Sequence, residues 1–282
     1  RMLRVLALLP LPLLYAFFGF VARVLRVIGW RRDLVEQGLA RCLPGLGEEA
    51  RHRTVHQFYV SLGRLAAEFA HAPRISPASL ERRMRFENPE LILEALRADR
   101  RVLLVAAHHC NWEWLLLRCS TAFDEPLVAA YKPASSSRAD VEIQAIRCRF
   151  GATMIPANDL VQHLLAQRGR VRLLAMLADQ SPPAHSEQQC WLPFFGLDTA
   201  FYRGPGWISA RMGYEPFFIA VRPDGRGRYI ARFVPLLAPG ERPEPDRVLR
   251  AYVHALEQKV IAYPAQYFWA YNRWKRPKGL YD

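Results

Sequence analysis

The stretch VLLVAAHHCNWEWLLL, residues 102–117, decides which fold we expect for this chain. It begins with a short apolar run, residues 102–107, which is typical of a strand buried on both faces of a sheet. Polar residues follow at 108–113, and a helix-like segment then continues to Leu117. A buried strand that leads directly into a helix is the first half of a β–α–β unit. We therefore expect an α/β protein.

The same alternation continues toward the C-terminus. Further strands are expected at residues 126–131, 152–156, 171–178, 215–222 and 228–235. Helices are expected at residues 138–150, 158–169 and 246–262. Strands that alternate with helices imply a mixed, largely parallel sheet flanked by helices on both faces. We assign residues 31–282 to one such domain, with a helical lead-in to about residue 100 that includes an amphipathic helix near residues 48–72.

Length and composition exclude several classes of protein. With 282 residues, of which 51% are hydrophobic and 23% charged, the chain is neither disordered, collagen-like nor a small disulfide-rich scaffold. Its five cysteines have no Cys-x-x-Cys spacing, which argues against a zinc ribbon and favours reduced thiols. The formal net charge of +13 indicates polyanionic partners: nucleic acid, an anionic membrane or an acidic carrier protein.

The N-terminal segment carries a long uncharged run. From Val5 to Ala22 the sequence VLALLPLPLLYAFFGFVA has no charged residue, and arginines flank it on both sides. Such a run is at the lower limit of the roughly 17–25 residues that span a bilayer. More basic residues follow the run than precede it, so a spanning helix would leave the rest of the chain in the cytoplasm. A signal peptide and a buried core helix are the alternatives, and we expect residues 1–30 to form a membrane anchor or an interfacial helix.

The cluster HHCNWE, residues 108–113, follows the first buried strand directly. In open α/β sheets, ligands bind beyond the carboxyl ends of the strands. A turn into a helix can bring Glu113 back toward His108, where the carboxylate would orient the imidazole as a general base. The chain has no Gly-x-Ser-x-Gly motif, which favours direct attack by a substrate hydroxyl over a covalent acyl-enzyme. A metal site is the alternative, but successive residues of a strand point to opposite faces, which disfavours one ion shared by His108 and His109.

Several short motifs, in order along the chain, resemble those of the bacterial lipid A biosynthesis (lauroyl/myristoyl) acyltransferase family, within the wider lysophospholipid acyltransferases. The block HHCNWE matches the family's His-x-x-Asn-Trp-Glu and follows a hydrophobic N-terminal segment. The other matching blocks are YKP (131–133), RCRFG (147–151), ADQSP (178–182), LPFFG (192–196) and PAQYFWAYNRWKRPKG (264–279). The resemblance covers nearly the whole chain.

This resemblance implies an enzyme at the cytoplasmic face of the bacterial inner membrane that moves a fatty acyl chain from a thioester to a hydroxyl group. Acyl-carrier protein or acyl-CoA would be the donor, a lipid or glycolipid the acceptor, and no metal or other cofactor is implied. The loop SPPAHSEQQCW (181–191) replaces the glycine-rich stretch typical of the family, and His109 stands where an aromatic residue is frequent. These departures leave the acceptor open between a lipid A precursor and a lysophospholipid, an aminolipid or another glycolipid.

The predicted roles fall on eight residues. We predict that His108 removes the proton of the acceptor hydroxyl and that Glu113 orients His108. Asn111, with backbone N–H groups of the following helix, would stabilise the negative charge that develops on the thioester carbonyl. Residues predicted to bind substrate phosphates or to shape the site, with Asp179 paired to an arginine, are Lys132, Arg147, Arg149, Asp179 and Gln180.

Two other classes of function are weighed against this one. A non-catalytic lipid-binding protein could keep the fold, but it would be expected to lose at least one of His108, Asn111 and Glu113. The C-terminal basic residues are interleaved with tryptophan and tyrosine, which suits either a membrane interface or single-stranded nucleic acid. These basic residues are Arg273, Lys275, Arg276 and Lys278. The apolar N-terminus and the matched motifs favour an anionic membrane surface, and we expect no nucleic-acid partner.

Overall fold

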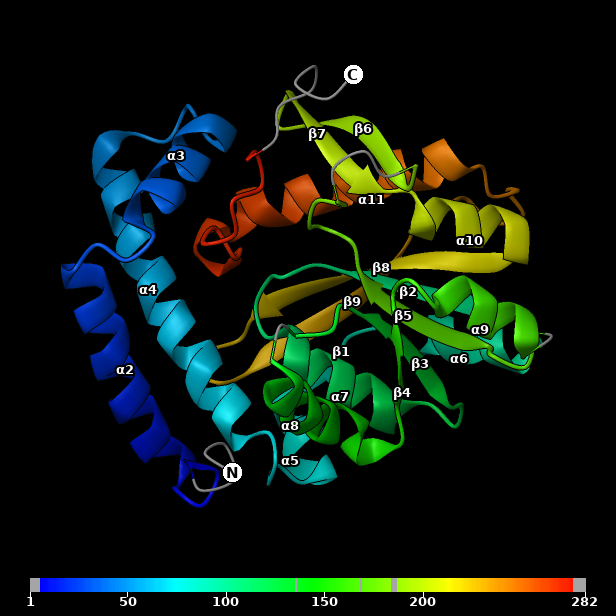
Figure 1. Cartoon of the computed structure of the whole chain (residues 1–282), viewed down its shortest axis with the longest axis horizontal. Coiled ribbons are helices and arrows are strands. Elements are labelled where there is room, and N and C mark those ends of the chain that lie inside the picture. The colour runs from blue at the N-terminus through cyan, green and yellow to red at the C-terminus, as the bar shows by residue number, and fades with distance from the viewer. Residues whose placement is uncertain (1–5, 135, 168, 184–186, 276–282) are drawn as a thin grey trace.

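The fold is taken from a computed structural model of the chain, which describes residues 6–134, 136–167, 169–183 and 187–275 (Figure 1). Arg276 and Lys278 of the predicted basic segment lie outside these ranges. So do Val5, at the start of the uncharged run, and residues 184–186 of the loop after Asp-Gln.

The described residues contain one seven-stranded sheet, in the order β1-β9-β8-β2-β5-β3-β4. Its strands are β1 (Met84–Phe86), β2 (Arg101–Ala106), β3 (Leu127–Tyr131), β4 (Thr153–Pro156), β5 (Leu173–Leu177), β8 (Tyr214–Pro223) and β9 (Tyr229–Pro235). Neighbouring strands run parallel except β8 and β9, which are antiparallel. The predicted fold class, a mixed and largely parallel sheet, is confirmed.

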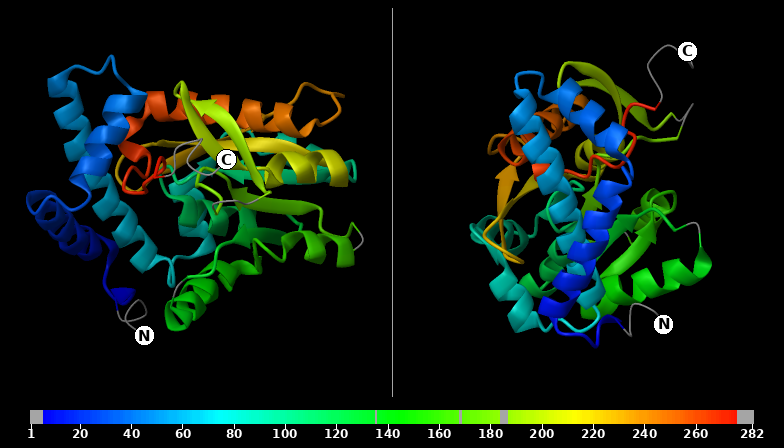
Figure 2. Two further views of the ribbon diagram at one scale, coloured as in Figure 1. Left: turned by 45° about the horizontal axis from the view of Figure 1, so that its top comes forward. Right: turned by 90° about the vertical axis from the view of Figure 1, so that its left-hand side faces the viewer.

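Helices cover both faces of this sheet (Figures 1 and 2). Alternate residues of β2 enter two separate cores: Leu103 and Val105 belong to one, and Leu104 and Ala106 to the other. This alternation follows from the period of two along a strand, and it accounts for the continuous apolar run of a strand that is buried on both faces. The helices that follow the N-terminal ones are α5 (Pro77–Arg83), α6 (Glu90–Arg97), α7 (Trp112–Ala122), α8 (Ser137–Arg147), α9 (Leu160–Ala166), α10 (Gly204–Met212) and α11 (Pro245–Ala262), with 3-10 turns η1 (Cys148–Phe150) and η2 (Pro264–Gln266).

The structure adds elements that the sequence pattern did not predict. Among them is a hairpin of β6 (Gln189–Phe194) and β7 (Leu197–Tyr202), which pair only with each other. Its turn residues Phe195 and Gly196 both have positive φ angles, of 53° and 72°. Two such residues form the tight turn that suits a two-residue hairpin. The turn was not predicted because a phenylalanine seldom adopts a positive φ angle.

Three helices precede α5: α2 (Leu11–Val27), α3 (Arg32–Cys42) and α4 (Glu48–His71). Helices α2 and α4 lie side by side at one edge of the molecule (Figures 1 and 2). They approach closely at Gly63, where an added Cβ atom would lie 2.8 Å from the carbonyl oxygen of Phe18, so a larger residue would push the helices apart.

The predicted N-terminal helix is therefore present, within residues 1–30. In the described part of the chain, length and hydropathy single out no individual helix as a candidate membrane span. Helices α2 and α3 meet the criteria only as a pair, bent by 81° at the residues between them.

Candidate active site

Strand pairing brings together two polar residues that are far apart in the sequence. In the parallel register of β2 and β5, Ala106 lies opposite Leu177. His108 and Asp179 each follow two residues after this pair in the sequence. Both therefore lie at the carboxyl edge of the sheet, where ligands of open α/β sheets bind.

The ring of His108 lies between two polar side chains. Its Nδ1 atom is 2.7 Å from Oδ1 of Asp179, and its Nε2 atom is 3.3 Å from Nε2 of Gln180. With the proton on Nδ1, the ring donates to Asp179, and the Gln180 amide donates to Nε2. The Asp179 carboxyl group is buried, which by itself raises its pKa, but the His108 ring and the charge of Arg273 together lower the pKa below its ordinary value. Asp179 is thus an anion suited to hold the imidazole in one tautomer.

The neighbouring histidine has a different environment. The ring of His109 lies in the core, with Nε2 3.3 Å from the carbonyl oxygen of Tyr263. Burial lowers the pKa of His109 to about 4, so the ring is neutral near pH 7. The expectation that the two histidines face opposite directions is confirmed: His108 lines a cavity, and His109 packs inside the protein.

Glu113 is paired with an arginine. Arg147 donates from Nε to Oε2 at 2.9 Å and from Nη2 to Oε1 at 2.6 Å, which is the two-point geometry preferred by arginine and carboxylate. The indole of Trp112 donates a further hydrogen bond to Oε1 at 3.1 Å. Two predicted pairings are therefore wrong. His108 is hydrogen-bonded to Asp179 and not to Glu113. The carboxylate that pairs with Arg147 is Glu113 and not Asp179.

Asn111 is completely buried beneath this turn. Its Oδ1 accepts from the backbone N–H of Trp114 at 2.8 Å and so caps the first turn of α7. Its amide nitrogen donates to Oε2 of Glu68 at 2.6 Å. Asn111 does not line the cavity beside His108, in contrast to its predicted role at the thioester carbonyl.

Glu68, on α4, is the residue of this region that sequence reasoning missed. Its side chain is completely buried and accepts hydrogen bonds from Tyr15, Asn111 and Tyr229. Burial raises the pKa of Glu68, and these three hydrogen bonds act in the opposite direction. The Glu68 carboxylate thus connects α2, α4 and the turn before α7. In the sequence it is visible only as a charged residue within the apolar stripe of a helix, which does not reveal these partners.

The remaining predicted residues separate into two groups. Lys132, Arg147 and Gln180 line the same cavity as His108 and Glu113. Arg149 instead donates to the carbonyl oxygens of Ala72 and Ile75, at 3.0 and 2.6 Å. This arginine joins η1 to the segment that follows α4 and is not part of the cavity lining, so its guanidinium has a structural partner where a substrate phosphate was predicted.

The cavity has a volume of about 890 Å³ and is lined by both polar and apolar side chains. Besides His108, its polar or charged lining residues include Glu113, Lys132, Arg147, Gln180, Arg203 and Arg211. The apolar lining residues come from β2, α7, β3, β4, β5, α10 and β8 and include Leu104, Leu115, Ala129, Met154, Ala175, Leu177, Ile208 and Ile219. Such a site can hold a long apolar group together with a polar group that reaches His108.

The C-terminal segment packs against the turn that carries His108. The carbonyl oxygen of His108 accepts a hydrogen bond from the N–H of Phe268 at 3.0 Å, and the rings of Trp112 and Phe268 lie 5.8 Å apart. Arg273 is buried and donates to the carbonyl oxygen of Ala200 at 2.6 Å. The prediction that this segment presents its basic residues to a membrane is therefore wrong for Arg273, which stabilises the interior near Asp179.

Within the described ranges, no group of three or more His, Cys, Asp and Glu side chains is arranged to hold a metal ion. The five cysteines, all described, are free thiols.

Comparisons with known proteins agree with the motifs. The chain matches the family described as bacterial lipid A biosynthesis acyltransferase over residues 1–276. It is also 26% identical over 280 residues to the lipid A biosynthesis lauroyltransferase of Escherichia coli strain K12. That alignment covers 96% of this chain and 89% of the relative.

Proposed function

The chain belongs to the bacterial lipid A biosynthesis acyltransferase family, and from this premise we propose that it transfers a fatty acyl chain from a thioester to a hydroxyl group of a lipid A-like acceptor. The thioester is carried by acyl-carrier protein or by coenzyme A. The name of the Escherichia coli relative supports a lipid A precursor as acceptor. The altered residues 181–191 keep another glycolipid, an aminolipid or a lysophospholipid as the alternative acceptor.

One observation carries this proposal: His108 lines a large cavity that also has many apolar lining residues, and the buried Asp179 carboxylate lies 2.7 Å from its Nδ1 atom. This leaves Nε2 on the side of Gln180 and the cavity. A histidine held in this way can act as a general base at neutral pH, because the carboxylate stabilises the imidazolium that forms.

The chemistry follows from that geometry. His108 Nε2 takes the proton of the acceptor hydroxyl as the oxygen attacks the thioester carbonyl carbon. The tetrahedral intermediate then collapses, the carbon–sulfur bond breaks, and the imidazolium returns the proton to the departing thiolate. The products are an ester and a free thiol, and Asp179 keeps its charge throughout.

Glu113 has a different role in this proposal from the one first predicted. It holds Arg147 through two hydrogen bonds and thereby fixes a guanidinium at the cavity wall. Together with Lys132, this arginine provides positive charge in the cavity that His108 also lines, which suits a phosphate of the acceptor or of the donor's phosphopantetheine. The pair is thus a substrate-binding element, and Asp179 is the orienting carboxylate.

The acyl chain is proposed to occupy the apolar part of the cavity. Each buried methylene contributes about 0.8 kcal/mol, so a chain of matching length binds more tightly than one that leaves the end of the cavity empty. Apolar lining residues such as Met154 and Ile208 would then determine chain-length preference.

Association with the membrane is also part of the proposal. Helix α2 exposes large apolar side chains on one stripe, at steps of three and four residues: Leu13, Phe17, Phe20, Val24 and Val27. Their exposed fractions lie between 41% and 76%. The opposite side of α2 packs on α4, so a helix lying in the membrane surface fits this arrangement.

The proposal is tested by mass spectrometry of lipid extracts from cells with and without the protein. We expect one lipid to gain the mass of a fatty acyl group only when active enzyme is present, and this lipid identifies the acceptor. The His108→Ala protein should not restore the product, whereas His254→Ala, at an exposed position on α11, should restore it. The absence of any acylated product with folded wild-type protein would favour a non-catalytic lipid-binding role.

A further inference from the structure

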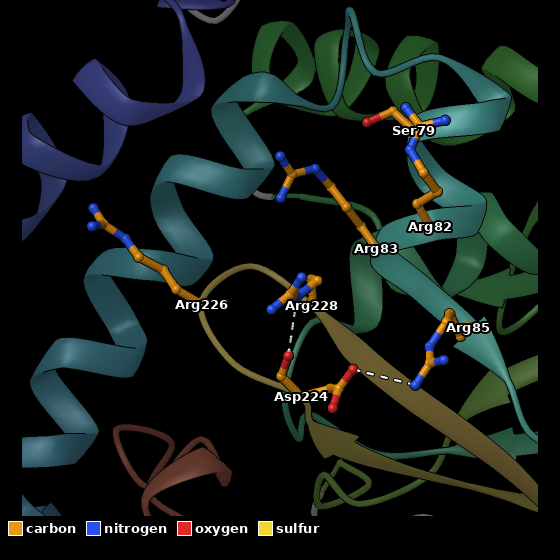
Figure 3. Close-up of a pocket in the computed structure, with 7 residues that line it drawn as sticks. All are labelled: Ser79, Arg82, Arg83, Arg85, Asp224, Arg226 and Arg228. Carbon is orange, nitrogen blue, oxygen red and sulfur yellow. Dashed lines mark hydrogen bonds and ion pairs between the residues drawn. The ribbon is translucent and has the colours of Figure 1, made fainter.

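A second cavity, of about 630 Å³, lies where α5, β1 and the turn between β8 and β9 meet (Figure 3). It is lined by Ser79, Arg82, Arg83, Arg85, Asp224, Arg226 and Arg228. The lining therefore contains five guanidinium groups and one carboxylate. None of these residues lines the cavity beside His108.

The arginines of this cavity, which we call the arginine pocket, use few of their donors on partners among the described residues. Arg83 donates from Nη1 to the carbonyl oxygen of Gly227 at 3.0 Å, and Arg85 from Nη2 to Oδ2 of Asp224 at 3.3 Å. Arg228 donates from Nε to the backbone oxygen of Asp224 at 3.3 Å. Each of these bonds engages one nitrogen, whereas a guanidinium carries five N–H donors. The pocket therefore concentrates positive charge and hydrogen-bond donors, the combination that phosphate groups require.

The arginine pocket is in direct contact with α2. The guanidinium of Arg226 lies over the ring of Tyr15, 4.6 Å from its centre. At Gly227, with φ of +65°, an added Cβ atom would lie 2.1 Å from the hydroxyl oxygen of Tyr15. Only glycine allows the turn to come this close, so one rim of the pocket rests on the side of α2 that faces α4, while the other side of this helix exposes the stripe from Leu13 to Val27.

An anionic membrane surface matches both the positive charge of the arginine pocket and the exposed apolar stripe of α2. The surface of an anionic bilayer places lipid phosphates directly above hydrocarbon, and basic side chains next to an interfacial helix bind such surfaces. An acidic carrier protein would match the charge but would leave the apolar stripe of α2 in water. The membrane is therefore favoured as the partner.

From these observations we infer that the arginine pocket binds the phosphate of an anionic lipid headgroup and, through its contact with Tyr15, anchors α2 at the membrane surface. The inference rests on the membrane association proposed above and adds the lipid class that provides it. The ligand is a phosphodiester of the surrounding bilayer, bound at a place separate from the acyl acceptor.

Vesicle flotation of the full chain tests this inference. The wild-type protein should bind vesicles of phosphatidylcholine with about 30 mol % phosphatidylglycerol more tightly than vesicles of phosphatidylcholine alone. Arg226 and Arg228 are both exposed, and replacing them together, as Arg226→Gln with Arg228→Gln, should weaken binding to the anionic vesicles about 10- to 30-fold.

A matched control removes the same charge elsewhere. Arg242 and Arg250 are exposed and lie before and within the first turns of α11, at the opposite end of the molecule from α2 (Figure 1). Replacing both by glutamine should change binding less than about threefold, whereas Arg226→Lys with Arg228→Lys should retain most of the wild-type affinity. Circular dichroism checks that each protein is folded.

The outcomes separate this inference from the proposed function. Equal loss of binding in the two glutamine pairs, or wild-type binding that is indifferent to phosphatidylglycerol, would overturn the inference while leaving membrane association intact. Unchanged vesicle binding with weakened use of acyl-carrier-protein thioesters would also overturn it, since the pocket would then recognise the carrier. Selective binding to anionic vesicles without any acyl product in the lipid extracts would uphold the inference and contradict the proposed enzyme.

Discussion

The turn between β2 and α7 has two sides with opposite characters. On the cavity side, His108 and Glu113 are held by Asp179 and Arg147, and the His108 Nε2 atom lies next to the Gln180 amide, which also lines the cavity. On the core side, His109 is buried and neutral, and Asn111 has both polar atoms of its side chain bonded inside the protein. The same short motif thus provides residues that face the cavity and residues that stabilise the core, and burial distinguishes the two groups.

The largest expected effect is on the cavity side. His108→Ala should lower the turnover number of purified enzyme by about 10²- to 10⁴-fold, because the variant lacks the proposed acceptor of the hydroxyl proton. Unfolding by urea should show a loss of stability of about 1–3 kcal/mol, because the buried Asp179 carboxylate loses its hydrogen-bond partner, and circular dichroism checks that the variant is folded. A folded His108→Ala protein with near-normal turnover would remove the distinction between the two sides.

The second prediction compares the two carboxylates of the site. Asp179→Asn should lower turnover about 10²- to 10³-fold, because an amide neither stabilises the imidazolium nor enforces one tautomer of His108. Glu113→Gln should act mainly through Arg147, and so raise KM more than it lowers kcat. If Glu113→Gln lowers kcat more than Asp179→Asn does, the originally predicted pairing of His108 with Glu113 is the correct one.

The third prediction concerns the core side. Glu68→Gln should lower the free energy of unfolding by about 2–4 kcal/mol, because buried donors of Tyr15, Asn111 and Tyr229 would lose acceptors. Tyr15→Phe, which removes one donor only, should cost about 1 kcal/mol. Chemical denaturation measures both values, and equal effects of the two substitutions would mean that Glu68 does not join the three elements.

The smallest effect is the pH dependence that arises from His109. Its pKa is about 4 in the folded protein and near 6.5 in the unfolded chain, so below about pH 6.5 the unfolded state binds more protons. The contribution of the neutral, buried His109 to the free energy of unfolding is fully present above that pH and is lost as the pH falls toward 4. Between about pH 7 and pH 5 this loss amounts to about 2 kcal/mol.

His109→Gln should remove that part of the dependence. Urea unfolding of both proteins at the two pH values provides the comparison. If the free energy of unfolding changes equally with pH in the wild type and in His109→Gln, a group other than the His109 ring is responsible.

Much of the framework follows from local sequence pattern. The strands expected at 126–131, 171–178 and 228–235 and the helix at 246–262 appear within one or two residues of the predicted bounds. Buried strands and amphipathic helices reveal themselves because each must bury an apolar face with a fixed period. The short strand β1 and the hairpin of β6 and β7 escaped prediction, because three residues carry too little pattern and a phenylalanine occupied the turn.

The site could be predicted in its composition but not in its pairing. The motif HHCNWE and the Asp-Gln of residues 179–180 identified most of the residues that surround His108. Arg149 and Asn111 were misplaced, since a basic or amide side chain next to a motif can equally satisfy backbone or core groups, as both do here. Only their burial and hydrogen-bond partners distinguish the two cases.

By itself, the sequence determined an α/β chain with a polar cluster at the end of a buried strand, because apolar period and turn chemistry are local properties. Which carboxylate meets His108 was decided by the tertiary structure alone. Asp179 lies 71 residues away and reaches His108 because β5 is the neighbour of β2 with Ala106 opposite Leu177. Strand order and register depend on how all seven strands pack together, and no local pattern encodes them.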